Sequence, residues 1–160
     1  MITHPIPPVY DERSEILILG SFPSIKSREQ AFFYGHPQNR FWKVVSAVFG
    51  VAEPKTVEEK RAFLLSSRIA VWDVIESCDV VGSSDSSIKN VRTNDLSVIL
   101  DVAKIKRIFV NGKTAYLLYN KLIRDKTHME AVCLPSTSPA NATYSLQKLI
   151  EKWRNCLLKT

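Results

Sequence analysis

Residues 32–42 of this 160-residue chain combine aromatic rings with side chains that can read the edge of a heterocycle. Five rings lie in this stretch, together with four polar side chains: His36, Gln38, Asn39 and Arg40. A buried core segment does not carry so many donors, because each would need a partner, and a solvated loop does not carry so many rings. The mixture predicts a pocket that stacks on a flat heterocycle and hydrogen-bonds to its rim, as an enzyme that extrudes a base from a duplex requires.

Two further segments could contact a ligand through backbone amides and hydroxyl groups. Residues 20–24 (GSFPS) follow an apolar run, and a glycine there lets the backbone approach a ligand, although a turn stiffened by Pro23 explains it equally well. Residues 134–141 (LPSTSPAN) place three consecutive hydroxyls between two prolines, and such side chains often contact phosphates. The alternative for this segment is a polar cap before the last helix, with Asn141 or Thr143 at the N-cap.

The elements that must position these segments alternate between strands and helices. Apolar or β-branched runs predict strands at residues 15–19, 69–75, 107–110 and 131–134. Periodicity and capping signals predict helices at residues 40–49, 56–67, 95–103, 113–123 and 143–158, with a polar loop at residues 82–94. This order predicts an α/β fold, a three-layer α/β/α sandwich with a central four-stranded parallel sheet, forming a single domain over residues 1–160.

In such a sheet, ligands bind beyond the carboxyl ends of the strands. The segments that follow the predicted strands are residues 20–24, Trp72 and Asp73, Asn111 and Gly112, and residues 135–141. We therefore expect them to converge, with the aromatic stretch, on one cleft.

Composition favours a basic protein with an anionic partner. The formal net charge is +6 and the isoelectric point is about 9.3, which favours nucleic acid. Three widely spaced cysteines form no metal-binding motif, so we expect no metal, no cofactor and no disulfide framework, and expect Cys133 and Cys156 to be core residues. The N-terminus lacks the apolar core of a signal peptide and no apolar run approaches ~20 residues, so we expect a cytoplasmic protein without a membrane span.

Taken together, three of these motifs resemble the uracil–DNA glycosylase superfamily. Its members carry Gly-x-x-Pro-[Gly/Ser] after the first strand and a Pro-Ser motif after the last, here residues 20–24 and 135–138. Residues 35–42 (GHPQNRFW) are similar to a His-Pro-x-Asn-Arg-Phe-Trp segment of the mismatch-specific branch. With the Trp-Asp pair at a strand end, the combination most resembles the hypoxanthine–DNA glycosylase branch, over about residues 16 to 153.

The resemblance implies that Asn39 is the catalytic residue. Most members have Asp or Asn two residues after the first-motif glycine, where it positions the attacking water, but this chain has Phe22 there. In the mismatch-specific branch, the Asn of the second segment lies in the same pocket. A side-chain amide cannot take a proton at neutral pH, but it can orient a water and donate to the leaving base. A helix cap is the alternative role, and the two are compatible.

Four further residues are expected to bind the base. Tyr34 would stack on it, Phe22 would form the opposite wall, and His36 would donate to a carbonyl or a phosphate. Asp73 would accept from the N1–H of hypoxanthine or the N3–H of uracil. The alternatives are core rings for Tyr34 and Phe22, a structural His36, and a capping or solvated Asp73.

A second group of residues is expected to contact the DNA around the extruded nucleotide. These are Ser24, Ser136, Thr137, Ser138, Pro139 and Lys113. The serines and threonine would bind phosphates, and Pro139 or Ala140 would lie near the gap left in the base stack. Lys113 follows a glycine at a helix start, where free amides favour an anion.

The function expected from the resemblance is a monofunctional DNA glycosylase that excises deaminated bases, chiefly hypoxanthine, in base excision repair. Its partner would be double-stranded and possibly single-stranded DNA, bound by a monomer. The alternatives are a mismatch-specific uracil or thymine glycosylase and a non-catalytic module that binds damaged DNA.

Overall fold

A central sheet of four parallel strands organises the computed structural model, which describes residues 1–4 and 6–158. The strands, in spatial order, are β3 (Ile69–Asp73), β2 (Ile16–Gly20), β6 (Arg107–Asn111) and β7 (Ala131–Leu134). Each strand runs parallel to its neighbours. The predicted sheet is confirmed, and its strand order is a property that the sequence pattern did not reveal.

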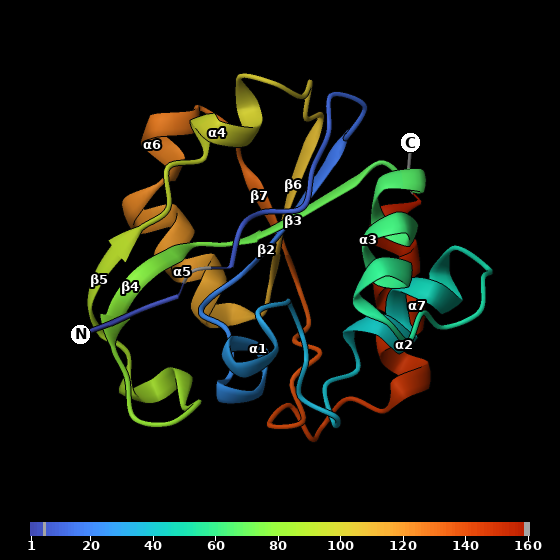
Figure 1. Ribbon diagram of the computed structural model, residues 1–160, viewed down its shortest axis with the longest axis horizontal. Helices are drawn as coiled ribbons and strands as arrows, with labels where there is room; N and C mark the ends of the chain where they lie inside the picture. The colour runs from blue at the N-terminus through green and yellow to red at the C-terminus, as the bar shows by residue number, and fades with distance from the viewer. Residues whose placement is uncertain (5, 159–160) are drawn as a thin grey trace.

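Helices cover both faces of this sheet, as Figure 1 shows. On one side lie α2 (Phe41–Val48), α3 (Val57–Ser66) and α7 (Leu146–Leu157), and on the other lie α4 (Ser97–Leu100), α5 (Lys113–Leu122) and α6 (Arg124–Thr127). A short helix, α1 (Ile25–Gln30), follows β2. The predicted three-layer α/β/α sandwich is therefore confirmed.

The apolar runs form buried strands because layers on both sides remove them from water. Leu17, Ile18 and Leu19 of β2 are completely buried. β7 is an edge strand that pairs only with β6, and its Cys133 is exposed while Cys156 of α7 is half-buried. The expectation of a core position is therefore wrong for Cys133, because an apolar sequence neighbourhood does not decide which face of an edge strand meets the core, whereas Cys156 does pack against the core.

Side-chain caps begin three of the described helices, α1, α3 and α7. Thr56 and Glu59 form the predicted capping box at the start of α3. α7 begins after Ser145, whose hydroxyl accepts the N–H of Lys148, so neither Asn141 nor Thr143 is its N-cap. The residues before Ser145 are thus free to form a separate loop.

A second, antiparallel sheet was not predicted. It contains β1 (Ile2–Thr3), β4 (Ile75–Asp79) and β5 (Lys89–Thr93), in the order β1-β4-β5. The strand predicted at residues 69–75 ends at Asp73, because the chain bends at Val74 and enters β4. β5 lies within the predicted polar loop at residues 82–94, and its exposed Lys89, Asn90 and Arg92 conceal the strand in the sequence.

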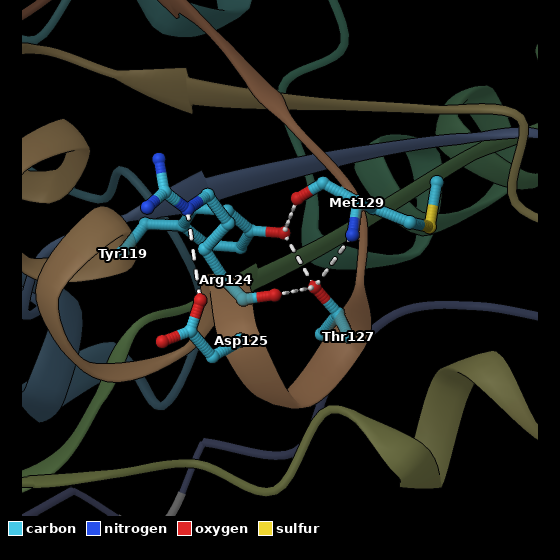
Figure 2. A network of polar contacts seen from close by, with 5 residues as sticks. All are labelled: Tyr119, Arg124, Asp125, Thr127 and Met129. Carbon is cyan, nitrogen blue, oxygen red and sulfur yellow. Dashed lines mark hydrogen bonds and ion pairs between the residues drawn. The ribbon is translucent and has the colours of Figure 1, made fainter.

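A network of polar contacts anchors the segment before β7, as Figure 2 shows. The hydroxyl of Tyr119 in α5 donates to the carbonyl oxygen of Met129 at 2.7 Å and lies 2.8 Å from the hydroxyl oxygen of Thr127. That threonine oxygen also accepts the N–H of Met129 at 3.3 Å. The α6 turn is thus hydrogen-bonded to Met129, which leads into β7 and so toward residues 135–141.

The helices described here include none that is both long enough and apolar enough to span a bilayer.

Candidate active site

A cleft of about 1000 Å³ lies at the carboxyl ends of the central strands. Its walls come from residues 20–24 after β2, Asp73 at the end of β3, residues 111–114 after β6 and residues 133–141 around the end of β7. The residues predicted from the sequence to contact the base or the DNA all line it: Phe22, Ser24, Tyr34, His36, Asn39, Asp73, Lys113, Ser136, Thr137, Ser138 and Pro139. The expected convergence of strand ends is therefore present, whereas the role of each residue is a separate question.

Asn39 lies just before α2, with its side-chain amide in a defined orientation. Its Oδ1 accepts the backbone N–H of Phe41 at 2.9 Å and the hydroxyl of Thr137 at 2.9 Å. An N–H can only donate, so the atom facing Phe41 must be the oxygen. The amide nitrogen, Nδ2, has no partner among the described residues and is not closed off from solvent. The N-cap of α2 is Arg40, so Asn39 is not the helix cap; its oxygen is used by Phe41 and Thr137, which leaves the NH₂ group for the cleft.

Thr137 connects Asn39 to the end of β6 and is completely buried. Its N–H donates to Oδ1 of Asn111 at 3.1 Å, which fixes the orientation of that amide. Nδ2 of Asn111 donates back to Oγ1 of Thr137 at 3.0 Å, so the threonine hydroxyl hydrogen is left for Asn39. A buried hydroxyl committed in this way does not suit the predicted phosphate contact, and it suits the orientation of Asn39 instead.

Asp73 is a buried carboxyl group beside the cleft, only 3% exposed. No described residue donates a hydrogen bond to either carboxyl oxygen. Burial, and then the charge of Asp85, raise the pKa of Asp73 to about 7. Gly20 lies opposite it on β2, where an added Cβ would be 2.5 Å from its Oδ1, so only a glycine here lets the carboxyl lie this close to the β2 backbone.

The aromatic stretch divides between core and cleft. Phe32, Phe33, Phe41 and Trp42 are buried core residues, so the expectation that this stretch does not belong to the core is only partly correct. Tyr34 has a left-handed φ of 52° and stacks on Phe41 with ring centroids 4.0 Å apart. Its hydroxyl is buried, which raises the pKa of the phenol above its usual value.

Phe22 and His36 also line the cleft. The Phe22 and His4 rings form a T-shaped pair with centroids 5.3 Å apart, and the guanidinium carbon of Arg28 lies 5.4 Å from the centre of the Phe22 ring. Nδ1 of His36 accepts the N–H of Gln38 at 3.1 Å, so a neutral His36 carries its proton on Nε2. His36 is therefore equipped to donate.

The loop of residues 135–141 is stiffened by its own hydroxyls. Oγ of Ser136 accepts the N–H of Ser138 at 3.1 Å, and Oγ of Ser138 accepts the N–H of Ala140 at 3.2 Å. Each hydroxyl accepts here, so its hydrogen is available to donate to an anion. Pro139 and Ala140 are exposed at the tip of this loop.

Arg40 clamps the same loop from the start of α2. Its guanidinium donates to the carbonyl oxygens of Ser138 at 2.9 Å, Asn141 at 3.1 Å and Tyr144. Its own N–H donates to the carbonyl oxygen of Thr137 at 3.0 Å. The sequence suggested that Arg40 could hydrogen-bond to the edge of a base, but its guanidinium holds the loop instead.

Two of the predicted DNA contacts lie at helix starts. Ser24 caps α1, accepting the N–H of Ser27 at 3.1 Å and donating to the Ser27 hydroxyl at 3.1 Å. Lys113 is the first residue of α5, is exposed, and forms no ion pair with any described residue. Gly112 before it has φ of 100°, a conformation that favours glycine.

Sequence reasoning missed Asp85 and His4, and it gave Asn111 no role beyond its place at a strand end that reaches the cleft. Asp85, in the 3₁₀ turn η1 (Asp85–Ser87), accepts the Ser21 hydroxyl at 3.1 Å and lines the cleft. His4 is buried, with Nε2 3.7 Å from Oδ2 of Asp73. Asp85 and His4 gave no sequence signal, because their segments reach the cleft through the unpredicted second sheet. Within the described residues, no group of three or more His, Cys, Asp or Glu could hold a metal ion.

Comparisons with known proteins agree on the family. The model of the uracil DNA glycosylase superfamily matches residues 7–158. A hypoxanthine DNA glycosylase of Methanosarcina acetivorans is 39% identical over 147 residues, covering 91% of this chain and 92% of that protein. A hypoxanthine DNA glycosylase of Methanosarcina barkeri is 34% identical over 137 residues, covering 84% of this chain and 85% of that protein.

A solved structure has the same architecture. The solution structure of a candidate uracil DNA glycosylase from Methanosarcina acetivorans superimposes with a TM-score of 0.82 and is 36% identical in sequence. The match covers 98% of this chain and 96% of that one. With the cleft at the strand ends and the family model over nearly the whole length, this chain belongs to the uracil DNA glycosylase superfamily.

Proposed function

We propose that this protein is a monofunctional DNA glycosylase that extrudes and hydrolytically removes deaminated bases, chiefly hypoxanthine, from DNA in base excision repair. The observation that carries the proposal is the oriented amide of Asn39, whose oxygen is held by Phe41 and Thr137 while its NH₂ group is left for the cleft. The two similar Methanosarcina proteins named hypoxanthine DNA glycosylase support the choice of base.

The base enters the cleft and stacks on Tyr34, whose far face already rests on Phe41. Phe22 forms the other wall. Tyr34 is thereby a rigid platform, and a flat base gains contact area without ordering a mobile ring. Asp73 contacts the edge of the base, and Nε2–H of His36 donates to a carbonyl or a phosphate.

Breaking the N-glycosidic bond creates positive charge on the sugar and negative charge on the leaving base. Both acceptor positions of Asn39 Oδ1 are occupied, so this residue acts as a donor through Nδ2. Nδ2 then donates a hydrogen bond either to the oxygen of the attacking water or to the departing base. The amide itself does not exchange a proton. Phe22 stands where most of the superfamily positions the water, which gives this task to Asn39.

The DNA backbone is held around the cleft. Ser136 and Ser138 have hydroxyl hydrogens available for phosphate oxygens, and Lys113 adds a positive charge. Pro139 and Ala140 at the exposed loop tip lie near the gap that the extruded base leaves. Ser24, at the start of α1, is a further proposed contact to the DNA backbone. Thr137 is the exception, and its proposed role is to orient Asn39.

The remaining properties follow from this assignment. Residues 1–160 act as one glycosylase domain, a monomer that binds double-stranded DNA and can bind single strands, in the cytoplasm. No lysine lies within the three motifs to form a Schiff base, so the reaction is hydrolysis without strand cleavage.

The test is base release from labelled duplexes that carry one deoxyinosine, one deoxyuridine or one G·T mismatch, read as strand breaks after alkali. We expect cleavage at deoxyinosine by the wild type and a loss of about 10²–10³-fold in Asn39→Ala. The matched control is Gln38→Ala, whose exposed side chain neighbours Asn39.

Other outcomes select the alternatives. Cleavage only at deoxyuridine or at the mismatch would make the protein a mismatch-specific uracil or thymine glycosylase. Tight binding to the deoxyinosine duplex without base release, equal for wild type and Asn39→Ala, would make it a non-catalytic damage-binding module.

A further inference from the structure

The carboxyl group of Asp73 lacks the partners that a buried carboxylate needs. It is 3% exposed, and no described residue donates a hydrogen bond to it or pairs with it through a lysine or arginine. Its nearest basic group is Nε2 of His4, 3.7 Å from Oδ2. A buried carboxylate without donors is costly, so the neutral acid is favoured in this position.

Each titratable group around Asp73 leaves it without a positive partner. His4, in the segment after β1, donates from Nε2 to the carbonyl oxygen of Ile75 at 2.8 Å, and burial lowers its pKa, so it is neutral. Tyr34 is a neutral phenol. Asp85, on η1, contributes negative charge and thus also favours the protonated form of Asp73. Arg28 of α1 is directed at the Phe22 ring and the carbonyl oxygen of Gly82.

The same carboxyl is accessible to a ligand. Asp73 and Gly20 both line the cleft, and the missing Cβ at Gly20 lets Oδ1 of Asp73 lie against the backbone of β2, where a Cβ would be only 2.5 Å away. The protein therefore presents a neutral acid, rather than a charged one, to the edge of a bound base.

We propose that Asp73 is the general acid of base release and passes its proton to N7 of the extruded purine as the bond from C1′ to N9 breaks. This inference rests on the proposed function. The electron pair of the broken bond goes to the base, water adds to C1′, and one proton of that water goes to solvent. Hypoxanthine leaves as the neutral base, and the Asp73 carboxylate regains a proton from solvent.

The assignment divides the chemistry between two residues. An amide such as Asn39 positions and donates hydrogen bonds but cannot give up a proton. A purine presents N7 as an acceptor on its imidazole ring, which uracil lacks. A proton donor therefore favours purine release, in agreement with the proposed preference for hypoxanthine.

The experiment measures single-turnover hypoxanthine release from pH 5 to 9 for wild type, Asp73→Asn and Asp85→Asn, with duplex affinity measured in parallel. We expect the wild-type rate to fall as the pH rises through about 7, the pKa of Asp73. Asp73→Asn is isosteric but has no carboxyl proton, and it loses about 10²–10⁴-fold in rate with little change in affinity and no decline above pH 7. Asp85→Asn removes a negative neighbour, so the midpoint of its decline moves to lower pH.

Several results would overturn the inference. One is an Asp73→Asn rate within tenfold of wild type at pH 6, and another is a loss of rate that is matched by a loss of duplex affinity. A ¹³C NMR titration of the wild-type Asp73 carboxyl tests the same point without a variant, and a pKa below 5 would contradict it. Wild-type protein that releases no hypoxanthine at any pH would instead refute the proposed function, and the inference with it.

Discussion

The hydroxyl of Thr137 donates to Oδ1 of Asn39 at 2.9 Å, joining the loop after β7 to the segment that leads into α2. The direction of this hydrogen bond follows from the Asn111 amide, which is oriented by the Thr137 N–H and donates to the hydroxyl oxygen. Asn39 is thus held directly by the loop after β7, and the end of β6 fixes that loop through Asn111. Such support keeps a reacting group in its productive orientation.

Thr137→Val should therefore reduce base release without preventing DNA binding. Valine has the same shape but cannot donate to Asn39 or accept from Asn111, so we expect a rate loss of about 10–100-fold. The unpaired buried groups should also lower the free energy of unfolding by about 1–3 kcal/mol. Thr137→Ser keeps the hydroxyl and should recover most of the rate. A serine variant as slow as the valine variant would show that the hydroxyl is not what matters.

Asn39→Asp separates the two functions of the Asn39 side chain. A carboxylate can still accept the N–H of Phe41 and the hydroxyl of Thr137, so the unfolding temperature should change little. It lacks the NH₂ group that we assign to the cleft, and base release should fall by about 10²–10³-fold, as for Asn39→Ala. Single-turnover rates and thermal unfolding measure the two effects. Wild-type activity in Asn39→Asp would show that the amide nitrogen has no catalytic role.

Gly20→Ala tests the space beside Asp73. The added Cβ would lie 2.5 Å from Oδ1 of Asp73 and 3.0 Å from the Tyr34 hydroxyl, so a buried side chain must move. We expect a loss of stability of about 1–3 kcal/mol and a marked loss of base release. Gly82→Ala serves as the matched control for stability alone, because its φ of 62° is strained for alanine although nothing lies within 4 Å of the added carbon. Full activity in Gly20→Ala would argue against Asp73 as a site residue.

Lys113→Gln should weaken DNA binding in a salt-dependent manner. If the exposed ammonium group neutralises one phosphate, the slope of log K against log salt should become less steep by about 0.9. Lys121→Gln is the control of equal charge, because Lys121 lies in the last turn of the same helix and is not part of the cleft. Fluorescence anisotropy at several salt concentrations gives both slopes. Equal slopes for the two variants would place the phosphate contact elsewhere.

Asp73→Asn should stabilise the folded protein, and more so at high pH. The folded pKa of about 7 lies above the ordinary value of 3.8, so between these values the folded state retains a proton that the unfolded state has lost. Stability is therefore lost as the pH rises from about 4 to 7. The asparagine side chain does not titrate, so the stability of the variant relative to wild type should increase across this window by about 4 kcal/mol, the free energy of a pKa rise from 3.8 to about 7, and then level off. Urea unfolding at pH 5 and pH 8 measures it, and an equal difference at both values would contradict the buried, unpaired carboxyl.

Much of the fold was predictable because its signals are local. The apolar runs that form β2, β6 and β7 and the capping box of α3 depend on residues close together in the chain, and the alternation of strands and helices predicted the parallel sheet. The second sheet was not predictable in the same way. β5 is polar and exposed, and it is a strand only because β4 pairs with it.

The candidate site also combines features that local sequence predicts with features that depend on tertiary contacts. The residue types and spacing of residues 20–24, 35–42 and 134–141 determined the family, the cleft-lining segments and the choice of Asn39, because these are properties of short stretches. Only the tertiary structure decided that Thr137 orients Asn39 from 98 positions away, that Arg40 clamps the loop, and that Asp73 lies unpaired beside His4 and Asp85. Burial, hydrogen-bond direction and the shift of a pKa depend on the groups that folding brings together, so they are absent from any local pattern.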